Sequence, residues 1–331
     1  MEDIFNLQPN KIPTNLGTYP MIWLSEDTGD GKSYSMNLFL NQICEANKKP
    51  LFIMLEDRYQ MIPNIMAVRV RSIPELMSLI AKLKTPKAKE LYSCIVIDTI
   101  DKLDSMLENY VATSKEVEIT AELGFGKGNL YVKGKLFMLD DLKNNGWVVH
   151  SIGQCKKVVN FVNNSVSFEP KVNKELWAKL AQDAYFIGMI TKDPKSEERL
   201  LTFKKSAKYP ALKDSNNLPL VIKLADLKKT IENAILKIEG ATFTDLDTIN
   251  EVVISKVDIE SLKVRGKELG SMLANVGRVE EALNILRVNL GVADEKTKTP
   301  NMLDSLLPTQ IELAQVVVLE LEGLCSTYKL I

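Results

Sequence analysis

The sequence has almost no net charge, a single histidine and few cysteines. Its 331 residues carry 42 basic and 43 acidic side chains, which leave a net charge of -1 at pH 7. Such a chain has no overall basic footprint for nucleic acid, so any such contact must come from a local patch or from oligomerisation. The 4 cysteines are scattered without a C-x-x-C pair, which argues against a zinc site or a disulfide framework. A reducing cytoplasm is the expected compartment.

Long apolar runs and targeting signals are also missing. No apolar stretch approaches the roughly 20 residues that a transmembrane helix needs. Residues 1–5 are acidic and do not have the pattern of a signal peptide. Hydrophobic residues make up 45% of the chain and charged residues 26%, as in an ordinary globular protein. We therefore expect a cytoplasmic protein with no membrane partner.

One stretch near the N-terminus has the pattern of a phosphate-binding loop. A short apolar run, residues 21–24, leads into a glycine-containing turn, and a helical pattern begins at Gly31-Lys32-Ser33. Backbone N–H groups of such a loop and of the following helix bind phosphate oxygens. We expect ATP and Mg²⁺ here, with Lys32 at the β- and γ-phosphates and the Ser33 hydroxyl at the metal. The expected nucleotide-binding residues are Thr28, Gly29, Asp30, Gly31, Lys32, Ser33 and Tyr34.

The loop departs from the usual G-x-x-x-x-G-K-[ST] pattern at its first position, where Glu26 replaces glycine. Glycine permits unusual backbone angles and a close approach at this position. Glu26 and Asp27 also bring negative charge near the loop, which is unfavourable unless both side chains point away from the phosphates. A plain strand–turn–helix unit without a nucleotide is the alternative interpretation.

Three further apolar runs end in polar side chains that suit a nucleotide site: Glu56, Asp98 and Gln154. In an open α/β sheet the carboxyl ends of the strands face the ligand crevice. The run before Asp98 has the shape of a Walker B strand, whose carboxylate holds Mg²⁺ together with Ser33. The alternative for Asp98 is the N-cap of the next helix. His150, the single histidine, fits a structural role better than a chemical one.

Lysines follow several of the later strands. The glycine-rich segment with Phe125 and Lys127, and the segment that starts with Lys156 and Lys157, are candidate contacts to single-stranded DNA. A flexible surface loop is an equally good interpretation of the first, and a solvated hairpin turning at residues 163–164 is the alternative for the second. Three lysines near the last strands fit a solvated edge, or a cation supplied to a neighbouring subunit in an oligomeric ATPase: Lys204, Lys205 and Lys208.

The order of these patterns divides the chain into three parts. Residues 1–19 are expected to form an irregular N-terminal arm. Residues 20–239 alternate strands with helices, which predicts an α/β core with a mainly parallel central sheet and a β-hairpin at its C-terminal end. Residues 240–331 are predicted to be a helical domain. We find no catalytic pattern in this tail, so we expect it to bind DNA, a partner protein or other copies of the chain.

The order of the motifs resembles the RecA-like P-loop ATPases, most closely the compact phage-encoded RecA-like proteins of single-strand annealing recombination. The resemblance covers about residues 15–225, and it is carried by residues 29–33, 52–56, 95–99, 124–128, 151–154 and 199–213. It implies a RecA-like core that binds ATP and Mg²⁺, forms a ring or filament of identical subunits, and binds single-stranded DNA.

The resemblance also implies roles for single residues. Glu56 matches the glutamate that polarises the attacking water, and Gln154 matches the residue that couples the γ-phosphate to the DNA-binding loop after it. Lys204, Lys205 and Lys208 lie where the family can supply cations across a subunit interface.

Two functions fit the sequence. The first is a Mg²⁺-dependent, DNA-stimulated ATPase that acts on single-stranded DNA in recombination, repair or replication. The second is a nucleotide-gated binding module with slow or no hydrolysis, whose helical tail recruits a replication or packaging partner. Glu26, the near-neutral charge and the long tail favour the second. A metabolic P-loop kinase needs a lid with clustered arginines, and the sequence has no arginine between Arg71 and Arg199.

Overall fold

The computed structural model describes residues 11–331 except for 27–28, 45–46, 58–59, 125, 135, 161–163, 215, 245–257, 295 and 308–309. In chain order, its first part contains β1 (Ile12–Pro13), β2 (Met21–Ser25), α1 (Lys32–Ile43), β3 (Lys49–Met54), β4 (Met66–Arg69), α2 (Ile73–Leu83), α3 (Pro86–Leu91), β5 (Tyr92–Asp98), α4 (Ile100–Ser114), α5 (Lys127–Lys133), α6 (Phe137–Asn144), β6 (Val149–Asn160), β7 (Ser165–Pro170), α7 (Lys174–Asp183), β8 (Phe186–Lys192), β9 (Arg199–Thr202), β10 (Lys213–Asp214), β11 (Ile222–Lys223), α8 (Leu227–Ile235) and β12 (Phe243–Thr244). Short 3-10 helices lie at Leu16–Thr18, Thr120–Leu123 and Leu224–Asp226.

One large sheet organises this part of the chain. Its strands lie in the order β11-β9-β8-β2-β6-β5-β3-β4, with β7 paired to β6 and β10 paired to β8. Strands β8, β2, β6, β5, β3 and β4 are parallel to their neighbours in this series, whereas β9 and β11 continue it in antiparallel fashion. The predicted fold class is confirmed: a mainly parallel α/β core ends in the β8–β9 hairpin and is followed by helices.

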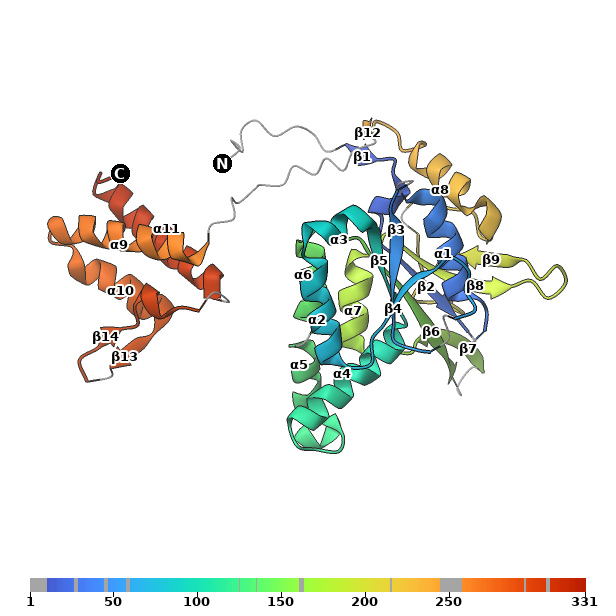
Figure 1. Ribbon diagram of the computed structural model, residues 1–331, viewed down its shortest axis with the longest axis horizontal. Helices are drawn as coiled ribbons and strands as arrows, with labels where there is room; N and C mark the ends of the chain where they lie inside the picture. The colour runs from blue at the N-terminus through green and yellow to red at the C-terminus, as the bar shows by residue number, and fades with distance from the viewer. Residues whose placement is uncertain are drawn as a thin grey trace. The chain divides into compact units, whose positions relative to one another are not determined.

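Helices cover both faces of the sheet, as Figure 1 shows with α2, α4, α6 and α7 on one side and α1 and α8 on the other. Successive side chains of a strand point to opposite faces. In β2, Ile22 and Leu24 pack on the first side, while Met21 and Trp23 pack on the second. Burial on both faces explains why the central strands appear in the sequence as continuous apolar runs.

Local signals set the helix boundaries. The Ser72 hydroxyl accepts a hydrogen bond from the Glu75 backbone N–H at 3.3 Å, which caps α2 as the sequence predicts. Asn173 caps α7 in the same way through the Leu176 N–H at 2.9 Å. One helix is predicted between residues 130 and 144, but the structure has two, α5 and α6, in this region.

The chain divides into two compact units between residues 249 and 250. The first unit extends past residue 240 because Phe243–Thr244 pairs in parallel with Ile12–Pro13. In the predicted N-terminal arm, residues 1–10 lie outside the described residues. Leu16 and Tyr19 are buried in the core of the first unit.

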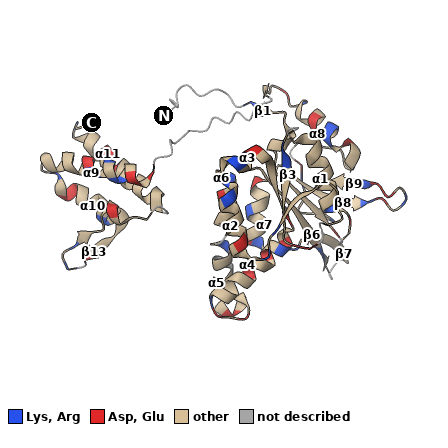
Figure 2. Cartoon of the chain, viewed as in Figure 1, with Lys and Arg blue, Asp and Glu red and all other residues tan. Residues whose placement is uncertain are grey.

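The second unit contains α9 (Ile259–Asn275), α10 (Val279–Leu290), the short hairpin of β13 (Val292–Asp294) and β14 (Thr299–Pro300), a 3-10 helix (Leu303–Ser305) and α11 (Ile311–Thr327). The three α-helices pack around their own apolar core, which includes Leu269, Leu273 and Val317. Figure 2 shows Lys and Arg interspersed with Asp and Glu over both units, consistent with the near-zero net charge. Among the described residues, no helix is both long enough and apolar enough to cross a bilayer.

Candidate nucleotide-binding site

The phosphate loop lies between β2 and α1, at the carboxyl edge of the sheet. Gly29 has φ of 100° and Gly31 has φ of 77°. Both angles lie in the left-handed region, which glycine adopts without steric cost. Gly31 is the N-cap of α1, so the free backbone N–H groups of the first turn follow it directly. The sequence therefore places glycine at the turn that opens this helix toward an anion.

Lys32 occupies a buried position behind the loop. Only 7% of its surface is exposed, and its Nζ donates a hydrogen bond to Ser25 Oγ at 2.7 Å. Burial lowers the pKa of Lys32, and the nearby carboxylates of Asp30, Asp98 and others oppose this effect. A buried ammonium at a helix N-terminus is a strong attraction for a phosphate group.

Asp98 ends β5 beside the loop and is nearly fully buried, with 3% exposure. Burial raises the pKa of Asp98 from 3.8 to about 6, partly opposed by hydrogen bonding from the Ser33 hydroxyl, while Glu56 raises it further. Its buried Oδ2 has no hydrogen-bond partner among the described residues. A buried oxygen without a partner fits a cation or a metal-bound water.

Glu56 and Gln154 come from the strands on either side of β5. Glu56 follows β3, and its Oε1 accepts a hydrogen bond from Thr99 Oγ1 at 3.4 Å. Gln154 lies in β6, which is paired with both β5 and the loop strand β2, and it stands opposite Ser25 in the register. The sequence predicts Gln154 near the γ-phosphate if its strand neighbours the Walker B strand, and this pairing is present.

One cleft of about 210 Å³ unites these groups. It is lined by Gly29, Gly31, Lys32, Ser33, Tyr34, Glu56, Ile62, Asp98, Thr99 and Gln154. Thr28 lies outside the described residues, and Asp30 acts on the cleft through its charge on Lys32. Thr99 and Ile62 are absent from the prediction. Thr99 directly follows Asp98, so a local signal existed for it, whereas nothing in the sequence marks Ile62.

The donor set fits Mg²⁺ bound together with a nucleotide. Mg²⁺ takes oxygen ligands, keeps several waters and commonly uses only one or two protein groups plus phosphates. Ser33 and Asp98 supply one hydroxyl and one carboxylate in the cleft, and the unpartnered Asp98 Oδ2 is suited to this role.

Comparison with known proteins supports the same assignment. Residues 18–214 match the family model described as AAA domain. The chain belongs to this AAA domain family. The matched span runs from just before β2 to β10 and includes every residue of the cleft. A crystal structure of the RadB recombinase is similar to this AAA protein at 13% sequence identity and a TM-score of 0.34, over 58% of this chain and 81% of that chain. No curated protein matches the chain.

Glu26, the residue in place of the first loop glycine of this AAA domain, binds groups from a distant segment. Its carboxylate forms an ion pair with Lys208 Nζ at 3.0 Å and accepts a short hydrogen bond from the Tyr209 hydroxyl. The Lys208 ammonium also lies over the rings of Tyr209 and Phe168. The negative charge that the sequence places beside the loop is therefore matched by a positive one.

The other lysines predicted to act across an interface lie near Lys208. Lys204 donates a hydrogen bond to Asn217 Oδ1 at 3.2 Å, and Lys205 is exposed. Lys208 is engaged by Glu26 of its own chain.

The predicted DNA-binding lysines lie on exposed backbone. Lys156 and Lys157 are exposed residues of β6, where it forms a hairpin with β7, so this segment is a strand pair. Lys127 is the first residue of α5 and is exposed. Phe125 lies outside the described residues. His150 is fully buried, and its Nδ1 accepts a hydrogen bond from the Met21 N–H at 3.3 Å, as a structural histidine would.

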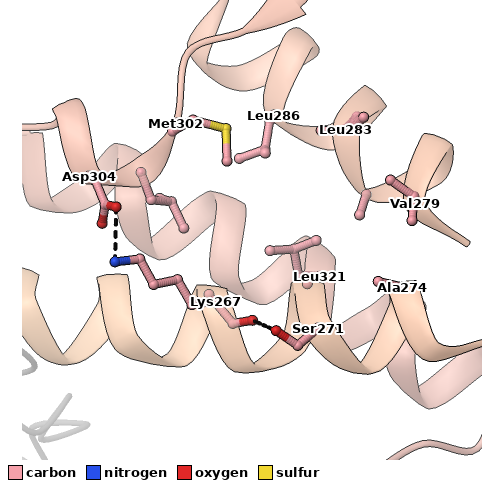
Figure 3. Close-up of a pocket in the computed structure, with 13 residues that line it drawn as sticks. Lys267, Ser271, Ala274, Val279, Leu283, Leu286, Met302, Asp304 and Leu321 are labelled. Atoms are coloured by element: carbon pink, nitrogen blue, oxygen red, sulfur yellow. Dashed lines mark hydrogen bonds and ion pairs between the residues drawn. The ribbon is translucent and has the colours of Figure 1, made fainter.

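A larger cavity, of about 440 Å³, lies within the second unit. Figure 3 shows its apolar side chains, among them Leu286, Leu283 and Val279 facing Leu321 and Ala274. Its charged groups, Lys267 and Asp304, pair with each other at 2.9 Å and are largely exposed. Because no polar groups converge inside it, this cavity lacks the means for chemistry on a substrate.

Proposed function

We propose that this protein is a RecA-like, Mg²⁺-dependent ATPase that acts on single-stranded DNA. One observation carries the proposal: Lys32, Glu56, Asp98 and Gln154 come from four separate elements and line one cleft. Membership of the AAA domain family supports nucleotide binding there. The resemblance of the motif order to proteins of recombination supports the DNA substrate.

The buried groups have defined roles in this proposal. Lys32 exchanges its hydrogen bond to Ser25 for the β- and γ-phosphates, which restore a counter-charge to the buried ammonium. Ser33 and Asp98 hold Mg²⁺, which neutralises charge on the phosphates when bound. Binding of the cation also keeps Asp98 ionised, although burial alone raises its pKa to about 6.

Glu56 is the residue that orients the attacking water. Its carboxylate is held by Thr99, which fixes its direction in the cleft. Gln154 contacts the γ-phosphate, and its strand continues without a break to Lys156 and Lys157. A change in the γ-phosphate state can thus alter the position of the basic hairpin through the strand itself. Lys127 and Phe125 add further DNA contacts.

Assembly into a ring or filament completes the proposal. In such an assembly, Lys204 and Lys205 of one subunit approach the cleft of the next. Lys208 does so only if its ion pair with Glu26 opens.

A nucleotide-gated binding module with little hydrolysis is the second candidate. The observation that favours it is the apolar cavity of the second unit, which offers a surface for an apolar partner. Glu26 no longer favours it, because its charge is paired with Lys208.

The steady-state ATPase rate with Mg²⁺, with and without single-stranded DNA, separates the two candidates. We expect turnover that DNA increases, and loss of that turnover in Lys32→Ala. A rate near zero despite measurable ATP binding would reject the ATPase and favour the binding module.

A further inference from the structure

Arg199 stands at the same edge of the sheet as the phosphate loop. It is the first residue of β9, which runs antiparallel to β8 and pairs it with Lys192. Strand β8 is parallel to β2, so the start of β9 meets the carboxyl end of β2. The topology therefore brings an arginine from residue 199 to a loop at residues 26–31.

The guanidinium of Arg199 packs directly on the loop. A Cβ atom built on Gly31 would lie 2.6 Å from both Nε and Nη2 of Arg199, which leaves no room for any side chain there. The guanidinium carbon also lies 5.1 Å from the centre of the Tyr34 ring, within cation–π range. Gly31 is thus required for this approach as well as for its backbone angle.

This cation has no carboxylate partner. Among the described residues, no ion pair involves Arg199, and its buried Nε has no hydrogen-bond acceptor. Neighbouring lysines differ, because Lys192 pairs with Glu197 and Lys223 pairs with Glu198. A buried donor without an acceptor is costly. A phosphate oxygen is a fitting acceptor, since arginine forms strong charge-assisted hydrogen bonds with phosphate.

The strand order places Arg199 away from the γ-phosphate. Glu56, Asp98 and Gln154 follow or lie in β3, β5 and β6, on one side of β2. Arg199 lies on β9, on the other side. We propose that Arg199 binds a non-terminal phosphate of the nucleotide, with the Tyr34 ring as its support. This inference rests on the proposed nucleotide binding at the cleft.

Equilibrium binding of Mg·ADP and Mg·ATP to the full chain tests the inference. We expect Arg199→Ala to weaken both nucleotides by the same factor, about 10-fold to 100-fold for one charge-assisted hydrogen bond. Arg199→Lys, which keeps the charge and the apolar stem, should give a smaller loss for both nucleotides. It also replaces the alanine variant if that variant does not fold. Lys192→Ala is the matched control, because it removes a cation from the same hairpin, and it should bind as the wild type does.

Each result has a distinct meaning. Wild-type affinity in both arginine variants would overturn the inference and leave the proposed function intact. Loss confined to ATP would overturn it too, because Arg199 would then act at the γ-phosphate. An equal loss in Lys192→Ala would reduce the effect to general charge and also overturn it. Failure of the wild type to bind either nucleotide would instead reject the proposed function itself.

Discussion

The two units of the chain handle polar groups in opposite ways. In the first unit, nine polar or charged residues are buried, including Lys32, Asp98 and Thr99 of the cleft. In the described part of the second unit no polar or charged residue is buried, and the largest cavity has apolar walls. Burying a charge is unfavourable unless it is paired. The first unit therefore carries a cost in stability where chemistry needs it, while the second is built for packing alone.

The loop strand β2 repeats this contrast on a smaller scale. On one side of it, the carboxylates of Glu56 and Asp98 and the amide of Gln154 share the cleft. On the other side lie cations: Arg199 on the loop and Lys208 on Glu26. A nucleotide with Mg²⁺ at one end and bare phosphate charge at the other suits such an arrangement.

Glu56→Gln should have the largest effect and bears on the first unit only. The variant keeps the shape of the side chain but cannot accept a proton from water, so hydrolysis should fall about 10²-fold to 10⁴-fold. Nucleotide affinity should change little. Single-turnover hydrolysis beside equilibrium binding checks this. Equal turnover by the variant would exclude Glu56 from the chemical step, and Glu75→Gln, outside the cleft, serves as a control.

Leu269→Ala tests whether the second unit depends only on packing. Leu269 is fully buried between the helices of that unit, and its truncation should lower the free energy of unfolding by about 2–5 kcal/mol. ATP affinity should not change. Calorimetry and nucleotide binding on the same sample measure both quantities. A weakened ATP affinity at full folding would show that the two units are coupled.

Asp98→Asn should stabilise the nucleotide-free protein although it removes the proposed metal ligand. The pKa of Asp98 is about 6 in the folded protein against 3.8 for the free group. The folded state thus holds this proton more tightly, and ionisation above pH 6 costs up to about 3 kcal/mol of stability.

The stability difference between Asp98→Asn and the wild type should therefore be largest near pH 8 and shrink as the pH falls from about 6 toward 4. Thermal melting over this pH range, without nucleotide, is the measurement. Mg²⁺-dependent ATP binding by the variant should be lost. A variant less stable than the wild type at pH 8 would contradict the view that Asp98 is held at a cost.

The basic hairpin gives the smallest expected effect. Lys156 and Lys157 are adjacent in β6 and point to opposite faces. Lys157 stands opposite Phe168, near Lys208, whereas Lys156 stands opposite Glu169. Lys157→Ala should therefore weaken single-stranded DNA binding more than Lys156→Ala, by a few-fold, and lower the salt slope by about 0.7. Equal and negligible losses would remove the hairpin from the DNA-binding surface.

Much of the site could be predicted because its signals are local. The strand–loop–helix order around Lys32, and the polar residues that end apolar runs, are properties of short segments. The rule that parallel strands present their carboxyl ends at one edge then brings Glu56, Asp98 and Gln154 together. The metal, DNA and interface roles of the individual residues remain predictions.

The sequence alone also shows that Glu26 replaces a glycine, but not where its charge goes. Its partner Tyr209 is 183 residues away, and only the fold brings the two together. The same holds for Arg199 on Gly31 and for β12 on β1.

Local periodicity, turn residues and apolar runs determined the α/β class, the phosphate loop and the helical tail, because each depends on the backbone preferences of neighbouring residues. The tertiary structure decided the strand order, the partners of Glu26 and the place of Arg199. These depend on which distant strands pair, and pairing is set by packing on both faces of the sheet, which no short segment contains.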